Sequence, residues 1–251
     1  EKNSIILTSA TLTTQGEFDY LRNRLNADEA DELMLGSPFD YENSTLLFLA
    51  KDIPEPTDAN NYQRSIDNTL IRLAKATGGR MLVLFTSYAQ LKRTSQNIGP
   101  ALADAEIQVY EQGEGASANI LLETFRETDR AVLLGTRAFW EGVDIPGEAL
   151  SVLVIIKLPF DVPSDPIIAS RSETFDDPFN DYQLPEAILR FRQGFGRLIR
   201  TQSDRGVVVV LDRRILTKRY GKSFTDSLPN CQVREGLLQD LPALTARWLN
   251  L

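Results

Sequence analysis

Short, uninterrupted apolar runs recur along the chain and constrain its fold more than any other feature. Such runs are typical of strands buried on both faces of a parallel sheet, where no alternate position has to meet water. Between them lie longer segments in which apolar residues recur at helical spacing. This alternation predicts an α/β fold, a mostly parallel sheet with helices on both faces. The runs are TLLFLAKDIP (45–54), MLVLF (81–85), AVLLGT (131–136), LSVLVIIKL (150–158) and GVVVVLD (206–212).

Helix signals fill most of the remaining chain. Thr86 or Ser87 can cap the helix that follows the run at 81–85. Residues 4–12, SIILTSATL, are predicted to form a short buried strand followed by a loop rich in hydroxyl groups. The predicted helices span 16–27, 61–76, 88 to about 103, 120–127, 184–200 and 237–249, and one more begins at about Arg213.

Small polar residues follow several of the apolar runs. Thr86 and Ser87 come after the run at 81–85, Thr136 ends the run at 131–136, and Asp212 ends the last run. The carboxyl ends of parallel strands share one edge of a sheet, and functional groups gather there. We therefore expect these side chains to lie along one rim.

Charge and composition limit the chemistry available to the chain. The 27 basic and 35 acidic side chains give a net charge of −8, which argues against a broad basic face but allows a narrow groove for a nucleic-acid backbone. One Cys and no His exclude a disulfide framework, a cysteine-held zinc or iron–sulfur site and histidine catalysis in this chain. No metal site and no membrane span are expected, and a reducing, cytoplasmic compartment fits.

The segment QGFGRLIR (193–200) is the strongest candidate for chemistry. On the helix predicted from Leu184, Arg190, Gln193, Arg197 and Arg200 fall at offsets 0, 3, 7 and 10 and share one face. Guanidinium groups arranged in this way suit phosphate oxygens. The alternative is a solvated basic helix face. A second stripe, suited to packing on a sheet, consists of Ile188, Phe191, Phe195 and Leu198.

Two short strings resemble nucleotide motifs without their context. DEAD at 28–31 lies in a polar helix end, whereas a magnesium-binding acidic motif has to end a buried strand. GKS at 221–223 lacks the glycine five positions earlier that a phosphate-binding loop requires, because Leu216 stands there. The chain therefore carries neither the phosphate-binding loop nor the magnesium-binding acidic motif of an ATP site.

Four segments, taken together and in order, resemble motifs III, IV, V and VI of superfamily 2 helicases. The wording FWEGVDIPG and QGFGRLIR is similar to the DinG/XPD-like branch, and the resemblance covers nearly the whole chain. It implies that 45–251 is the second RecA-like motor domain, that 1–12 ends the first motor domain and that 13–44 connects them. The segments are TSATL (8–12), LFTSY (84–88), GTRAFWEGVDIPG (135–147) and QGFGRLIR (193–200).

The resemblance implies roles for individual residues. Arg197 and Arg200 would be arginine fingers that reach the γ-phosphate held by the first domain, and Gln193 would orient the phosphates or the attacking water. The alternative is that both arginines only form salt bridges with surface carboxylates. Four residues would face the nucleotide: Glu141, Gly142, Asp144 and Gly196. Four would meet the nucleic-acid backbone: Thr86, Ser87, Thr136 and Arg137. Ser9 and Thr11 would couple the two domains.

Other readings of these residues stay open. Asp144 could be a helix cap or a loop brace, and Thr86 and Ser87 could simply cap a helix. Phe139 and Trp140 could belong to the core or form a stacking platform for a base.

The implied activity is that of an ATP-dependent DNA helicase moving 5′ to 3′ on single-stranded DNA. ATP and Mg²⁺ would be held mainly by the first motor domain, which is also a partner of this chain. The chain begins Glu-Lys-Asn without Met, which suggests an excised fragment that is inactive alone; an iron–sulfur cluster or an exonuclease extension would lie upstream. The alternatives are a RecA-like nucleic-acid- or protein-binding module without activity, and an RNA helicase.

Overall fold

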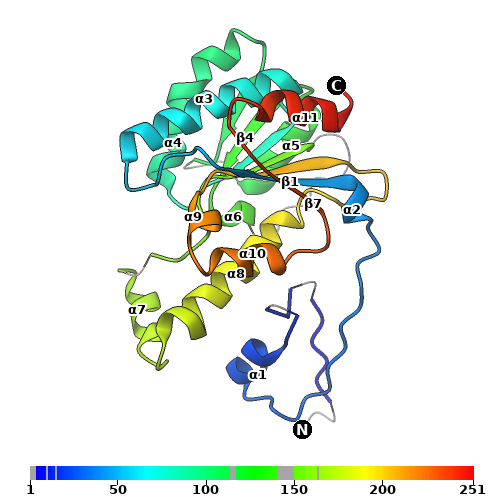
Figure 1. Ribbon diagram of the computed structural model, residues 1–251, viewed down its shortest axis with the longest axis vertical. Helices are drawn as coiled ribbons and strands as arrows, with labels where there is room; N and C mark the ends of the chain where they lie inside the picture. Colours follow the sequence, from blue (N-terminus) through cyan, green and yellow to red (C-terminus); the bar gives the residue numbers. More distant parts are fainter. Residues whose placement is uncertain (1–3, 10, 15, 114–116, 141–149, 163) are drawn as a thin grey trace.

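The computed structural model describes residues 4–9, 11–14, 16–113, 117–140, 150–162 and 164–251. Its centre is a seven-stranded sheet in the order β3-β4-β2-β5-β6-β1-β7 (Figure 1). Every pairing within this sheet is parallel, which confirms the predicted α/β architecture. The strands are β1 (Thr45–Ala50), β2 (Met81–Leu84), β3 (Gln108–Glu111), β4 (Ala131–Gly135), β5 (Val152–Ile155), β6 (Gly206–Val210) and β7 (Gln232–Gly236).

Helices cover the sheet on both sides. The long helices α3 and α4 pack with α11 on one face, and α8 lies with α10 on the other (Figure 1). The α-helices are α1 (Asp19–Leu25), α2 (Tyr41–Ser44), α3 (Ala59–Thr77), α4 (Tyr88–Ala103), α5 (Ala118–Glu127), α6 (Arg137–Trp140), α7 (Pro166–Ser172), α8 (Leu184–Phe195), α9 (Arg214–Thr217), α10 (Gly221–Asp226) and α11 (Leu241–Leu249); a π-helical turn spans Phe179–Gln183.

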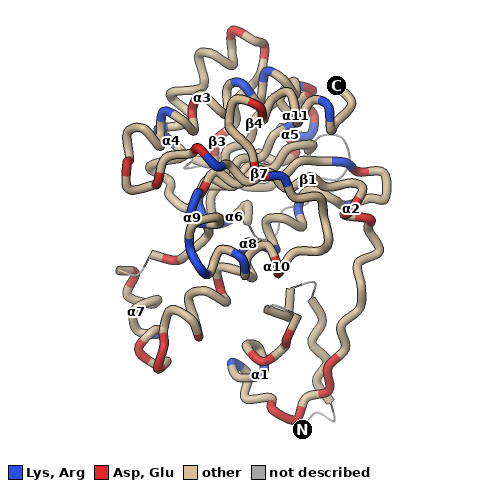
Figure 2. The backbone as a smooth tube through the Cα atoms, in the orientation of Figure 1, with Lys and Arg blue, Asp and Glu red and all other residues tan. Residues whose placement is uncertain are grey.

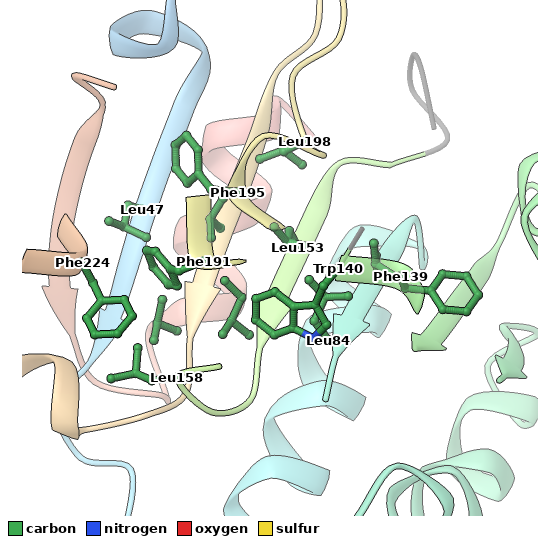
Figure 3. Packing of buried hydrophobic residues seen from close by; sticks show 14 of the residues in the cluster. Leu47, Leu84, Phe139, Trp140, Leu153, Leu158, Phe191, Phe195, Leu198 and Phe224 are labelled. Carbon is green, nitrogen blue, oxygen red and sulfur yellow. The ribbon is translucent and has the colours of Figure 1, made fainter. Parts of the chain in front are cut away.

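Each central strand contributes to two hydrophobic cores. In β2, Met81 and Val83 pack under α3 and α4, while Leu82 and Leu84 pack toward α8. This alternation follows from the period of two in a strand, so a continuous apolar run fills both faces. The α8 side of the core holds a cluster of aromatic side chains, shown in Figure 3, that includes Phe139, Trp140, Phe191, Phe195 and Phe224.

The amino-terminal segment does not form the predicted buried strand. Residues 4–9 have no strand pairing, and Ile5 and Ile6 are 79% and 83% exposed. An apolar run becomes a strand only where a sheet supplies hydrogen-bond partners, and no strand of this chain pairs with the described part of the run. Helix α1, predicted within 16–27, is present, and Tyr20 donates from its hydroxyl group to Glu186 of α8.

Other elements were missed or shortened. The edge strand β7 was not predicted because its sequence, QVREG, is polar and its first four residues are exposed. Charged residues on an edge strand hinder pairing with other chains. Helix α7 was not predicted either, and Asp165 caps it by accepting from the amides of Ile167 and Ile168.

Neither of the two short strings that resemble nucleotide motifs ends a strand. Residues 28–31 are exposed and lie beyond the end of α1 at Leu25, instead of in the predicted helix end. Residues 221–223 open α10, and a Cβ at Gly221 would lie 2.0 Å from the carbonyl oxygen of Ile215. Gly221 thus serves close packing of α10 on α9.

Candidate nucleotide and nucleic-acid sites

The end of α8 differs from the predicted continuous helix. The helix stops at Phe195, and the amides of Arg197 and Leu198 donate to carbonyls three residues earlier, so the chain turns there. Arg197 and Arg200 therefore lie beyond the helix instead of on its face. Glycine lowers helix stability, and two glycines near the end favour this stop. The predicted apolar stripe is confirmed, since Phe191 and Phe195 are at most 2% exposed.

Trp140 is the neighbour that shapes this turn. A Cβ at Gly194 would lie 2.9 Å from the indole ring, so only glycine lets α8 pack this closely on Trp140. The carbonyl oxygen of Trp140 accepts from Nη2 of Arg197 at 3.2 Å, and its indole Nε1 donates to the carbonyl of Phe85 at 3.1 Å. Trp140 is 1% exposed and thus connects the arginine turn to the end of β2 from inside the core.

Arg200 lies in a short loop braced by a carboxylate. Asp204 accepts from the amides of Arg200 and Thr201, at 2.7 and 2.8 Å. Burial raises the pKa of Tyr41, while a hydrogen bond with Ser37 and the positive charge of Arg200 act in the opposite direction. The backbone that carries Arg200 is therefore fixed by Asp204.

Gln193 and its neighbour contact the amino-terminal segment. Nε2 of Gln193 lies 3.4 Å from the hydroxyl of Thr11, which itself lies 3.4 Å from the hydroxyl of Ser9. The guanidinium of Arg192 donates to the carbonyl and, at 3.0 Å, to the hydroxyl of Thr13. Arg192 and Thr13 were not among the predicted residues. These contacts bring the predicted coupling residues to the helix that precedes the arginines.

Arg190, which helical spacing placed on one face with Arg197 and Arg200, forms an ion pair within the domain. Its guanidinium forms two hydrogen bonds with Asp161, at 3.0 and 3.1 Å, and one with the carbonyl of Pro159 at 2.8 Å. Both side chains of this ion pair are largely buried, at 11% and 16% exposure. The predicted basic face therefore does not form, because Arg190 binds the segment after β5 while Arg197 and Arg200 lie beyond the end of α8.

The predicted rim is present at the carboxyl ends of β2 and β4. Ser87 caps α4 by accepting from the amide of Gln90 at 3.4 Å, and Thr86 is exposed beside it. The amide and hydroxyl of Thr136 both donate to Oε1 of Gln112, at 2.8 Å each. Gln112 is a positioning residue that the sequence did not reveal, because it follows the distant strand β3. Arg137 is exposed at the start of α6.

A cavity of about 270 Å³, which we name the rim cavity, brings three predicted nucleic-acid residues together. Its lining includes Thr86, Thr136 and Arg137. Other lining residues come from the segment after β5 and from α7. Adjacent pairing of β2 with both β4 and β5 explains why these segments meet.

Asp212 occupies the same edge but has a structural role. The carboxylate is fully buried and accepts from the amide of Leu158 at 2.9 Å and from the guanidinium of Arg214 at 2.6 and 2.9 Å. Burial lowers the pKa of the nearby Lys157, and the charge of Arg214 lowers it further. Of the two roles open to Phe139 and Trp140, the core is confirmed, at 0% and 1% exposure.

Three predicted nucleotide-facing residues, Glu141, Gly142 and Asp144, lie outside the described residues. The fourth, Gly196, follows the end of α8 with φ of −66°, which any residue can adopt. Among the described residues no group of three acidic, Cys or His side chains could hold a metal ion. Likewise, no helix there has the length and apolarity needed to cross a membrane.

Solved structures with this fold define the class. The chain is similar to an XPD helicase structure, with a TM-score of 0.59, 21% identity and coverage of 77% of this chain and 36% of that one. It is also similar to the C-terminal domain of the DEAD-box protein Dbp5, with a TM-score of 0.52, 16% identity and coverage of 83% and 99%. The fold is thus that of a RecA-like helicase domain 2, as expected.

The family follows from the sequence match. Residues 70–231 match the helicase C-terminal domain, which is more than half of the chain. The chain belongs to this helicase C-terminal domain family. The resemblance stated from motifs III to VI is therefore confirmed.

Curated relatives are considerably longer than this chain. It is 38% identical to the 3′-5′ exonuclease DinG of Bacillus subtilis over 98% of this chain and 27% of the relative. It is 38% identical to the ATP-dependent DNA helicase YoaA of Escherichia coli over 90% of this chain and 35% of the relative. It is 36% identical to the ATP-dependent DNA helicase DinG of Photobacterium profundum over 89% of this chain and 34% of the relative. The chain spans about a third of the length of these relatives.

Proposed function

We propose that this chain is the second motor domain of an ATP-dependent DNA helicase that moves along single-stranded DNA from 5′ to 3′. Relatives named as ATP-dependent DNA helicases support the activity and the nucleic acid. The observation that carries the proposal is the turn at 196–200, where two arginines follow the helix whose Gln193 lies 3.4 Å from Thr11 of the predicted coupling segment. The direction rests on the resemblance to the DinG/XPD-like branch alone.

The arginine turn is suited to half of an active site. Arg197 and Arg200 would offer guanidinium groups to the transferring phosphoryl group of ATP, and Gln193 an amide. Phosphoryl transfer depends on charge stabilisation, and an inserted arginine contributes about 10³–10⁵ in rate. These side chains are donors and fit phosphate oxygens. ATP and Mg²⁺ would be held mainly by the first motor domain, and Mg²⁺ would neutralise developing charge on the phosphates.

The contacts of Trp140 suggest how the two sites communicate. One residue binds Arg197 through its carbonyl and the end of β2 through its indole. A shift of the arginine turn on ATP binding would therefore reach Thr86 through the packed core. Thr86, Ser87, Thr136 and Arg137 would hold the phosphate backbone, so that movement does not depend on base sequence.

The first test compares this chain with the complete protein that contains it and the first motor domain. We expect ATP hydrolysis by the complete protein to rise with single-stranded DNA and the isolated chain to turn over negligibly. Robust turnover by the isolated chain would show that no second domain is needed. Absence of DNA stimulation in the complete protein would favour the non-catalytic binding module.

A further inference from the structure

The lining of the rim cavity has two chemically different parts. One part consists of the proposed phosphate contacts Thr86, Thr136 and Arg137. The other part is apolar and aromatic, and it includes Tyr88 and Val162, which are 42% and 59% exposed. Exposed apolar side chains that gather at a concave surface indicate a binding site, whereas single ones scattered over a surface do not.

The two carboxylates in the cavity lining do not suit an anion. Asp161 and Asp165 both line it. Asp161 is held by Arg190, and Oδ1 of Asp165 accepts from the amides of α7. A phosphate placed here would meet two carboxylates, but an uncharged planar group with amino donors would find acceptors beside an apolar wall.

The apolar wall is rigid. Phe160 packs edge-on against Tyr220 and Phe224, with ring centroids 5.4 and 5.7 Å apart, and is stacked with Phe179 at 5.8 Å. The guanidinium of Arg214 lies 6.0 Å from its ring. Since its neighbours fix Phe160, binding against this wall costs little side-chain entropy.

We propose that the rim cavity receives one nucleobase of the bound single strand. Tyr88 and the Phe160–Val162 wall contact the base, while its neighbouring phosphates meet Thr86, Thr136 and Arg137. This inference rests on the proposed function and adds a base contact to it. Phe139 and Trp140, the aromatic residues suggested by the sequence for stacking, are buried, and the exposed ring at this edge is Tyr88.

An abasic scan in the complete protein tests the proposal. A forked duplex fixes the register of its single-stranded tail, and one abasic site is moved along that tail. We expect one position, or two adjacent ones, to weaken binding roughly 5- to 150-fold, the range of stacking on an aromatic side chain. Tyr88→Ala should abolish this position dependence and Tyr88→Phe should keep it. Val233→Ala, at a 49% exposed position on the far strand β7, is the matched control.

The outcomes separate this inference from the proposed function. Equal binding at all positions, or an abasic penalty that persists in Tyr88→Ala, would overturn the base site while leaving the helicase proposal intact. Failure of the complete protein to bind the intact tail would overturn both. Loss of position dependence in Tyr88→Ala alone, with normal binding by the control, supports the base site.

Discussion

Removing the buried carboxylate of Asp212 should destabilise the domain strongly. In Asp212→Ala, the amide of Leu158 loses its acceptor in the core, which costs about 1–3 kcal/mol. The guanidinium and the amide of Arg214 lose their hydrogen bonds to the carboxylate, but this side chain is 28% exposed and regains some hydration, so the loss adds only about 1–2 kcal/mol. Together we expect about 2–5 kcal/mol of lost unfolding free energy.

Urea unfolding of the isolated chain measures this loss as a lowering of the midpoint by about 1 M or more. Asp212→Asn keeps an acceptor for Leu158 and should lose only about half as much. Asp226→Ala is the control, because it removes the exposed ion pair with Lys222 and should cost at most about 0.5 kcal/mol. A loss below 1 kcal/mol in Asp212→Ala would refute the reasoning that this carboxylate braces the end of β6.

Four further outcomes are expected. Gly194→Ala should lower thermal stability by about 1–2 kcal/mol, because overpacking against Trp140 outweighs the gain in helix propensity; an unchanged melting temperature would contradict this packing. Burial raises the pKa of the Cys231 thiol to about 11. The stability that the neutral thiol contributes is therefore complete below pH 9 and is lost as the pH rises through 11. Cys231→Ala should flatten this decline in the free energy of unfolding, measured by denaturation at each pH. Arg137→Ala in the complete protein should weaken single-strand binding without changing ATP affinity and reduce the salt dependence by about 0.7 in slope. Thr136→Ala should have the smaller effect, since its hydroxyl donates to Gln112; loss of ATP affinity in either variant would reassign the rim.

The central strands could be predicted because their signal is local. A run such as MLVLF needs burial on both faces, and a parallel sheet is the arrangement that supplies it. Residues 4–9 show the limit of this reasoning, since this apolar run forms no strand when none of the described strands pairs with it. Strand β7 escaped prediction because, at the sheet edge, its exposed polar residues remove the apolar pattern.

The candidate site could be predicted in its residues but not in its arrangement. Helical spacing placed Arg190, Arg197 and Arg200 on one face, but contacts distant in sequence decide otherwise. Arg190 pairs with Asp161, 29 residues away, and α8 ends where Gly194 meets Trp140. Neither contact leaves a trace in the local pattern.

The most direct test of the central claim is the turnover of arginine variants in the complete protein. Arg197→Ala and Arg200→Ala should each lower DNA-stimulated kcat by about 10³-fold or more, with ATP binding and the unfolding transition close to normal. Arg126→Ala, which removes an exposed arginine of α5, is the matched control and should keep full activity. A kcat near that of the unaltered protein in either variant would contradict the account of these arginines as half of the active site.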